Sequence, residues 1–229
     1  MTLALYTTAR SANGRKPLAV ARQLGLDVEV HTVDVYRGEG QSAEYKELNP
    51  FGKIPTLVDG DGHSDGDGGM VLWESNAVIV YLAEAHGGYA LSSTDPKVRA
   101  GILRWLFWEA AHWQPVLAHA LAPRVGHILF ARGSGAPEPT VDWWAAAVSG
   151  ALGHVESYVR RTAFLCGDEV TLADFSVAGM TTYFAAAGFP EERYPGLAGW
   201  LRRMEGLPGW ASTWAEPWTA VADRELSEL

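Results

Sequence analysis

The side chains with the clearest chemical potential lie at residues 11–16, where the sequence SANGRK joins a short apolar run to a helical pattern. Ser11 supplies a hydroxyl and Asn13 an amide at the expected start of that helix. The first turn of a helix has unpaired backbone N–H groups and a partial positive charge. The segment could therefore stabilise an anion, although helix capping is the plainer explanation of an isolated Ser-x-Asn.

A second segment, NPFGKIP at residues 49–55, leads into a β-like run. Pro55 removes a backbone donor at the point where that strand would start. A cis Ile54–Pro55 bond would turn the backbone of Ile54 outward, free to pair with an extended ligand. A plain turn into an edge strand is the alternative.

A third segment, WESN at residues 73–76, opens a helical pattern that contains Tyr81. Ser75 can cap that helix, and the helix start can accept a carboxylate. Glu74 could accept an ammonium group. A carboxylate and an ammonium on one carbon form a free amino-acid end, although the segment alone is also explained as a cap.

The elements that would position these segments follow from hydrophobic periodicity. Apolar residues from Pro17 to Leu24 are spaced as on one face of a helix, which Gly25 ends, and residues 77–85 give a second one-faced helix. Short β-like runs are expected at residues 3–6, 28–33, 56–58 and 70–73. The order β-α-β, an irregular stretch, then β-β-α predicts a small mixed sheet covered by helices.

Helical patterns dominate the rest of the chain. A stretch rich in turn formers at residues 87–96 predicts a linker between domains at 1–86 and 97–229. Helices are expected at about 97–132, with a break near Pro115 or Pro123, and at 140–161. Another helix should begin at residues 171–174 (TLAD), which resemble a capping box. Further turns of helix are expected at 197–205 and 210–215.

Composition excludes several function classes. The chain has 229 residues and a net charge of −9, so it lacks the basic excess of a nucleic-acid binder or an anionic-membrane binder. No apolar run is long enough to span a bilayer, and the first residues do not look like a signal peptide, so a cytoplasmic protein is expected. Cys166 is the single cysteine, which excludes an intrachain disulfide and a CxxC site.

The Asp-rich residues 59–69 lack the order of a calcium-binding EF-hand, so a solvated hairpin loop and no metal are expected.

In combination, the three segments and their order resemble the glutathione S-transferase family over almost the whole chain. Residues 171–175 (TLADF) look like the family's helix-start motif, and residues 104–109 (RWLFWE) resemble bacterial members. The resemblance implies an α/β thioredoxin-like N-terminal domain, an all-α C-terminal domain and a homodimer. It also implies glutathione as co-substrate, bound by Lys53, Ile54, Pro55, Glu74 and Ser75.

Within that resemblance, each segment takes a role. Glu74 and Ser75 match positions that hold the γ-glutamyl end of glutathione. Ile54 matches the backbone that pairs with the cysteinyl unit beside the cis-proline at Pro55, and Lys53 matches a position that often contacts the glycyl carboxylate.

Thiol activation falls to the first segment. Ser11 matches the hydroxyl that activates the thiol in serine-type members, and Asn13 the asparagine of a bacterial class with Thr-x-Asn. A free thiol has a pKa of about 8.5, and a two-unit drop corresponds to roughly 2.7 kcal/mol. A charge-assisted hydrogen bond and a helix dipole can supply that much. Our hypothesis is that Ser11 dominates and Asn13 assists. The lack of a cysteine in this loop argues against the omega and glutaredoxin-like classes.

The resemblance also implies that the first helix of the second domain forms the pocket for the electrophile. Trp105, Trp108 and His112 fall at i, i+3 and i+7, on one face of a helix, although core packing also explains them. Either Arg124 or Arg132 could reach glutathione. In several classes an aromatic at the position of Phe51 inserts into the partner subunit; burial within its own subunit is the alternative.

The function implied is a glutathione S-transferase that conjugates glutathione to a small hydrophobic electrophile, as in detoxification. A close alternative uses the same thiolate to reduce disulfides or peroxides. A further alternative is a non-catalytic binding or regulatory protein on the same fold.

Overall fold

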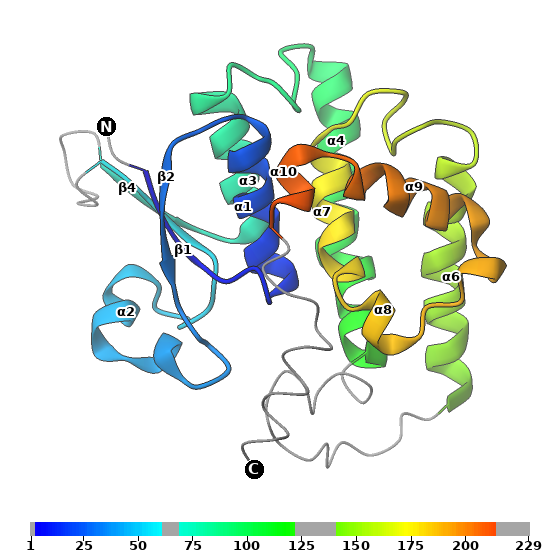
Figure 1. Ribbon diagram of the computed structural model, residues 1–229, viewed down its shortest axis with the longest axis horizontal. Helices are drawn as coiled ribbons and strands as arrows, with labels where there is room; N and C mark the ends of the chain where they lie inside the picture. Colours follow the sequence, from blue (N-terminus) through cyan, green and yellow to red (C-terminus); the bar gives the residue numbers. More distant parts are fainter. Residues whose placement is uncertain (1–2, 61–68, 122–140, 214–229) are drawn as a thin grey trace.

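The structure is a computed structural model that describes residues 3–60, 69–121 and 141–213 (Figure 1). Its first half contains one sheet with the strand order β2-β1-β3-β4. The strands are β1 (Leu3–Thr7), β2 (Val28–Thr32), β3 (Thr56–Asp59) and β4 (Met70–Trp73). β1 pairs with β2 in parallel and with β3 antiparallel, and β3 pairs antiparallel with β4. The expectation of a small mixed sheet is confirmed.

Two helices separate this sheet from the second half of the chain, as Figure 1 shows: α1 (Ala12–Gln23) and α3 (Ser75–Tyr81). A π-helical turn, η2 (Leu82–His86), extends α3. The stretch expected to be irregular contains a short 3-10 turn, η1 (Glu39–Gln41), and the helix α2 (Ala43–Leu48), which lies away from the helical half (Figure 1).

All the elements that the structure describes in the second half are helices or helical turns, so the expected combination of an α/β domain and an all-α domain is confirmed. Its elements are α4 (Pro96–Trp108), η3 (Glu109–Trp113), α6 (Val141–Val159), α7 (Leu172–Thr181), α8 (Phe184–Ala187), η4 (Glu191–Arg193), α9 (Pro195–Glu205) and α10 (Pro208–Ala211). None of the described helices is long and apolar enough to cross a membrane.

The long helix after the linker departs from α-helical geometry at Glu109–Trp113, before the expected break near Pro115 or Pro123. It becomes π-helical at η3 and then continues as an α-helix through residues 114–121. Pro115 therefore does not break it, because a proline in the first turn after a π-helical segment removes a donor that is easily dispensed with. Pro123 lies outside the described residues.

One continuous core joins the two halves. Every residue of α7 is buried, and α7 packs against both α1 and α4. The start of α7 is held by Asp174, whose Oδ2 accepts hydrogen bonds from the N–H and hydroxyl of Thr171 at 3.0 and 3.2 Å. Its Oδ1 accepts from the Leu165 N–H and from Nε1 of Trp200, each at 2.9 Å. The capping-box start expected here is confirmed, and the same carboxylate ties three elements together.

Candidate active site at the junction of the two halves

A cavity of about 290 Å³ lies where the loop before β3, the β4–α3 junction and the start of α1 meet η3. That volume suits a small ligand, at the lower end of the usual range for such sites. Its lining residues are Asn13, Asn49, Phe51, Lys53, Ile54, Pro55, Trp73, Glu74, Ser75, Asn76, Ala110 and Gln114. The cavity thus brings together six of the site residues expected from the sequence: Asn13, Lys53, Ile54, Pro55, Glu74 and Ser75.

The loop before β3 is fixed from behind by polar side chains. The carbonyl of Lys53 accepts hydrogen bonds from the Tyr45 hydroxyl at 2.7 Å and from Nδ2 of Asn49 at 2.8 Å. The Ile54–Pro55 bond is cis, as the sequence suggested. Ile54 is buried, whereas the side chain of Lys53 is exposed at the cavity edge. The loop is therefore held by its backbone, and the exposed Lys53 side chain can meet a ligand in the cavity.

The β4–α3 junction contains a strained residue. Glu74 has a φ of 74°, in the left-handed region that residues other than glycine rarely adopt. Such a conformation costs about 1–3 kcal/mol and is found most often at ligand sites. It leaves the Glu74 carboxylate exposed on the cavity wall, next to Ser75, which is buried. The junction therefore presents an acid and a hydroxyl side by side.

At the start of α1, Asn13 faces the cavity, whereas Ser11 lies outside the cavity lining. Ser11 is the N-cap, and its Oγ accepts the Gly14 N–H at 3.3 Å. The Ala12 N–H donates to the hydroxyl of Tyr183, from the second half, at 2.9 Å. Asn13 lines the cavity, and among the described residues nothing accepts its backbone N–H. Ser11 is not among the cavity-lining residues.

Ser11 instead adjoins two tyrosines, the half-buried Tyr36 and the buried Tyr183. Tyr36 has side-chain contacts with Ser11 and Tyr183, and burial raises its pKa while those contacts oppose the rise. Burial also raises the pKa of Tyr183. Both phenols are therefore neutral near pH 7 and serve Ser11 as hydrogen-bonding neighbours.

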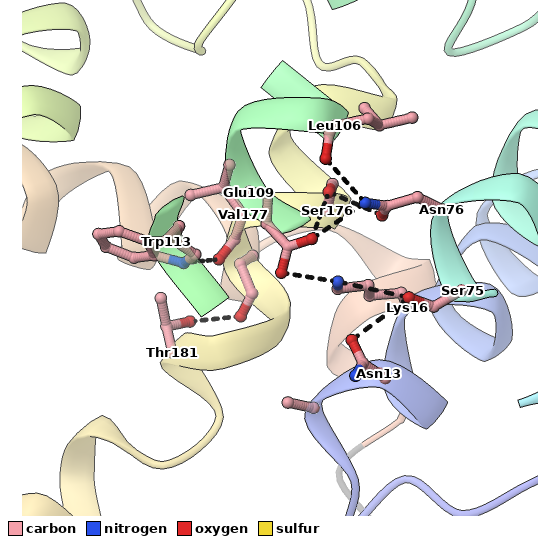
Figure 2. A network of polar contacts seen from close by, with 12 residues as sticks. Asn13, Lys16, Ser75, Asn76, Leu106, Glu109, Trp113, Ser176, Val177 and Thr181 are labelled. Atoms are coloured by element: carbon pink, nitrogen blue, oxygen red, sulfur yellow. Dashed lines mark hydrogen bonds and ion pairs between the residues drawn. The ribbon is translucent and has the colours of Figure 1, made fainter. Parts of the chain in front are cut away.

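A buried polar network lies directly beneath the cavity (Figure 2). Nζ of Lys16 is 2.9 Å from Oε1 of Glu109, and both side chains are fully buried. Nζ also donates to Oγ of Ser75 at 3.5 Å, and that hydroxyl donates to Oδ1 of Asn13 at 3.3 Å. Burial lowers the pKa of Lys16, and the Glu109 carboxylate opposes that change. The network connects two cavity residues to the second half of the chain.

The second half contributes Ala110 and Gln114 to the cavity lining, which the sequence analysis did not single out. Trp105 is buried and packs edge-on against Trp108 at 5.2 Å between ring centroids. His112 is exposed, and neither it nor the two tryptophans lines the cavity. Trp105, Trp108 and His112 would share one face only on an uninterrupted α-helix, whereas His112 lies within the π-helical segment Glu109–Trp113, which has a different rotation per residue.

Phe51 and Trp73 form the outer edge of the cavity. Phe51 is 61% exposed and meets Trp73 edge-on, with ring centroids 5.1 Å apart. Phe51 is therefore not buried within its own subunit. Its place in the NPFGKIP segment and the position of Trp73 beside Glu74 are signals that could have marked both as lining residues.

Two other sequence-based suggestions fall outside the described residues: Arg124 and Arg132 as glutathione contacts, and most of the Asp-rich loop at residues 59–69. Within the described part of the chain, no group of three or more His, Cys, Asp or Glu residues could hold a metal ion.

Comparison with known proteins agrees with this geometry. The model of the glutathione S-transferase N-terminal domain matches residues 1–84, and that of the glutathione S-transferase C-terminal domain matches residues 110–203. Together the two models span most of the chain, and the cavity draws its lining from both matched regions.

Solved structures give the same picture. A possible glutathione S-transferase from Rhodopseudomonas palustris is 26% identical with a TM-score of 0.81, and the match covers 95% of this chain and 100% of that one. A glutathione S-transferase from Pseudomonas fluorescens is 29% identical with a TM-score of 0.76, covering 91% and 97%. The glutathione transferase URE2P6 from Phanerochaete chrysosporium, in complex with oxidized glutathione, is 28% identical with a TM-score of 0.78, covering 96% and 97%.

Proposed function

The chain belongs to the glutathione S-transferase family, and from that premise we propose that it binds reduced glutathione in the cavity beside Pro55 and ionises its thiol. The observation that carries the proposal is the convergence of three sequence segments on one cavity, with Asn13, Ile54 and Glu74 each contributed by a different segment. The similar transferase from Phanerochaete chrysosporium holds oxidized glutathione, which supports the same ligand class here.

The proposed contacts match the chemistry of the tripeptide. The Glu74 carboxylate pairs with the γ-glutamyl ammonium, and Oγ of the neighbouring Ser75 accepts a hydrogen bond from the same ammonium. The backbone of Ile54 pairs with the cysteinyl unit beside Pro55. Lys53, exposed at the cavity edge, meets the glycyl carboxylate. These charges are complementary at both ends, so they fix the direction in which glutathione lies.

Thiol activation falls mainly to Asn13 in this proposal, which reverses the order expected from the sequence. Asn13 lines the cavity, whereas the Ser11 oxygen accepts the Gly14 N–H and lies outside the lining. In the first turn of α1 the Ala12 and Gly14 N–H groups have acceptors, and that of Asn13 has none among the described residues. The backbone and side chain of Asn13 can then both donate to a thiolate, while Ser11 holds the helix end in place.

The thiolate attacks the carbon of a small hydrophobic electrophile and displaces its leaving group. Ala110 and Gln114 form the described wall of the cavity on the electrophile side. Trp105, Trp108 and His112 stay proposals for that pocket: the tryptophans support the wall from within, and His112 is available to a larger substrate.

Disulfide reduction is the second candidate, favoured by the position of Asn13 in the cavity, since the Thr-x-Asn class implies that chemistry. The glutathione thiolate would attack one sulfur of a disulfide and release the other as a thiolate. A second glutathione would then resolve the mixed disulfide, yielding oxidised glutathione and the reduced product.

Calorimetric titration with reduced glutathione near neutral pH tests the proposal first, with S-methylglutathione as a ligand that lacks the thiol proton. Saturable binding of both supports the site, and no binding up to millimolar concentrations overturns it. Initial rates on an aryl halide and on a small organic disulfide then separate conjugation from reduction. Binding with neither activity would favour the non-catalytic alternative.

We further propose a cytoplasmic homodimer with domains at residues 1–86 and 97–229 and a role in detoxification. The 61% exposure of Phe51 supports its insertion into a partner subunit, because a large apolar side chain at a cavity edge is more stable when covered. Sedimentation velocity on the wild type and on Phe51→Ser tests this: the dimer should weaken in the variant, and a monomeric wild type would contradict it.

A further inference from the structure

The buried pair of Lys16 and Glu109 is unusual for its position. Lys16 comes from α1 and Glu109 from the start of η3, and neither side chain is exposed to solvent. A buried ion pair is often no more stable than apolar residues of the same size, because removing two charges from water costs about as much as their attraction returns. The pair therefore calls for an explanation other than stability.

Hydrogen-bond directions supply that explanation (Figure 2). An ammonium group only donates, so Oγ of Ser75 must accept from Nζ of Lys16 at 3.5 Å. The single hydroxyl proton of Ser75 is then directed to Oδ1 of Asn13 at 3.3 Å. Because an amide has one oxygen and one NH₂ group, fixing Oδ1 as the acceptor leaves Nδ2 as the donor for other partners. Asn13 is itself a cavity-lining residue.

Lys16 has little freedom to leave this position. A Cβ at Gly179 of α7 would lie 2.5 Å from Cε of Lys16, so the glycine lets α7 press directly on the lysine stem. Glu109 is fixed as well, because its Oε2 accepts a hydrogen bond from Nδ2 of Asn76 at 3.0 Å, and Oδ1 of Asn76 in turn accepts the hydroxyl proton of Ser176 at 2.8 Å. The helices α3 and α7 thus hold the pair in one arrangement.

We propose that Lys16, held by Glu109, is a positioning residue that orients the Asn13 amide through Ser75, so that Nδ2 donates to the glutathione thiolate. The inference rests on the proposed function of the cavity. The pair has no net charge, so it acts by fixing the amide orientation and not by a long-range field. The second half of the chain thereby sets the reactivity of a thiol bound by the first half.

The test removes both charges together with Lys16→Met/Glu109→Met, because a single substitution would strand a buried ion and could prevent folding. The thiol pKa of bound glutathione is measured from the ultraviolet absorbance of the thiolate as a function of pH. We expect it to rise by about one unit, the effect of a weakened hydrogen bond to a charged group, with glutathione affinity changed less than threefold. Arg99→Met/Glu84→Met removes a more exposed pair away from the cavity and should leave the pKa unchanged.

A second arm separates orientation from mere support of the fold. In an Asn13→Ala background, removing the pair should cause no further pKa rise, because the amide that it orients is already gone. A further rise of similar size would overturn the inference. Ser75→Ala breaks the connection while leaving the ion pair intact, so it serves if the double variant does not fold, and it should raise the pKa by a similar amount.

The outcomes distinguish a failure of the proposed glutathione binding from a failure of the proposed role of Lys16. If the wild type binds no glutathione, the proposed function fails. If it binds glutathione and the thiol pKa is the same with and without the pair, only the inference about Lys16 fails.

Discussion

Replacing Asn13 by alanine should raise the pKa of the bound glutathione thiol by about 1–2 units. Asn13 lines the cavity and its amide is oriented by Ser75. A hydrogen bond to a charged group contributes about 1.5–3 kcal/mol, and one pKa unit corresponds to 1.36 kcal/mol. Starting from a wild-type pKa near 6.5, the value for a roughly two-unit drop from that of a free thiol, the variant would titrate near 8.

That shift predicts a rate effect that depends on pH. At pH 7 the thiolate fraction falls from roughly three quarters to about a tenth, so kcat/KM should fall about eightfold. At pH 9 the bound thiol is almost fully ionised in both proteins, and the loss should nearly disappear. The assay is a pH profile of kcat/KM with an aryl halide, together with direct titration of the bound thiol.

Two matched variants sharpen this experiment. Asn13→Asp keeps the size of the side chain but replaces the donor by a carboxylate, so the pKa should rise further than in Asn13→Ala. Ser11→Ala removes the cap of α1, which costs about 1 kcal/mol of stability, and should move the thiol pKa by less than about half a unit. A larger shift for Ser11→Ala than for Asn13→Ala would refute the reasoning, as would an activity loss that persists at pH 9.

Three further predictions concern the scaffold. Gly179→Ala would place a methyl group 2.5 Å from Cε of Lys16, so thermal unfolding should show a loss of about 1–3 kcal/mol, and unchanged stability would mean that α7 can move away. Asp174→Asn replaces one of the two accepting carboxylate oxygens by an NH₂ group, which then faces N–H and O–H donors. Denaturant unfolding should therefore show a loss of about 2–4 kcal/mol in the free energy of unfolding, and a loss below about 1 kcal/mol would contradict the assigned hydrogen bonds. Arg99 lowers the pKa of Glu84, so the stability from their pairing is present above the ordinary pKa of 4.5 and is lost as the pH falls through the folded-state pKa. The Arg99→Gln variant should therefore be less stable than the wild type at pH 7, and the difference in unfolding free energy should shrink in acid. A difference that does not change with pH would contradict this prediction.

Much of the fold could be predicted from hydrophobic periodicity. The four predicted strands end within one residue of their observed ends, and Thr171 and Asp174 predict the capping start before α7. The helix α2 was missed because Ala43–Leu48 is too short for an apolar period to show. The π-helical turns at η2 and η3 were also missed, since their sequences are equally compatible with a continuing α-helix.

The candidate site was predictable where its residues are adjacent in sequence to a motif. Asn13, Ile54 and Glu74 are expected at one site because their three segments, in this order, resemble the glutathione S-transferase family. The contribution of the second half was not predictable, because the residues that line the cavity depend on the π-helical shift before Gln114. The burial of Lys16 was unexpected as well, since a lysine in the first turns of a helix usually reaches solvent.

The lysine–glutamate pair also restricts how the two halves of this chain can be inherited. A recombination point between residues 87 and 95 would cut only a connecting loop, yet it would separate Lys16 from both Glu109 and Gly179. A chimera with the second half of a relative would bury the lysine opposite an acid only if that relative carries one at the same place, with a small residue on the facing helix. Exchange of halves is therefore expected to succeed only between parents that share this combination, so the acid and the glycine should vary together with the lysine.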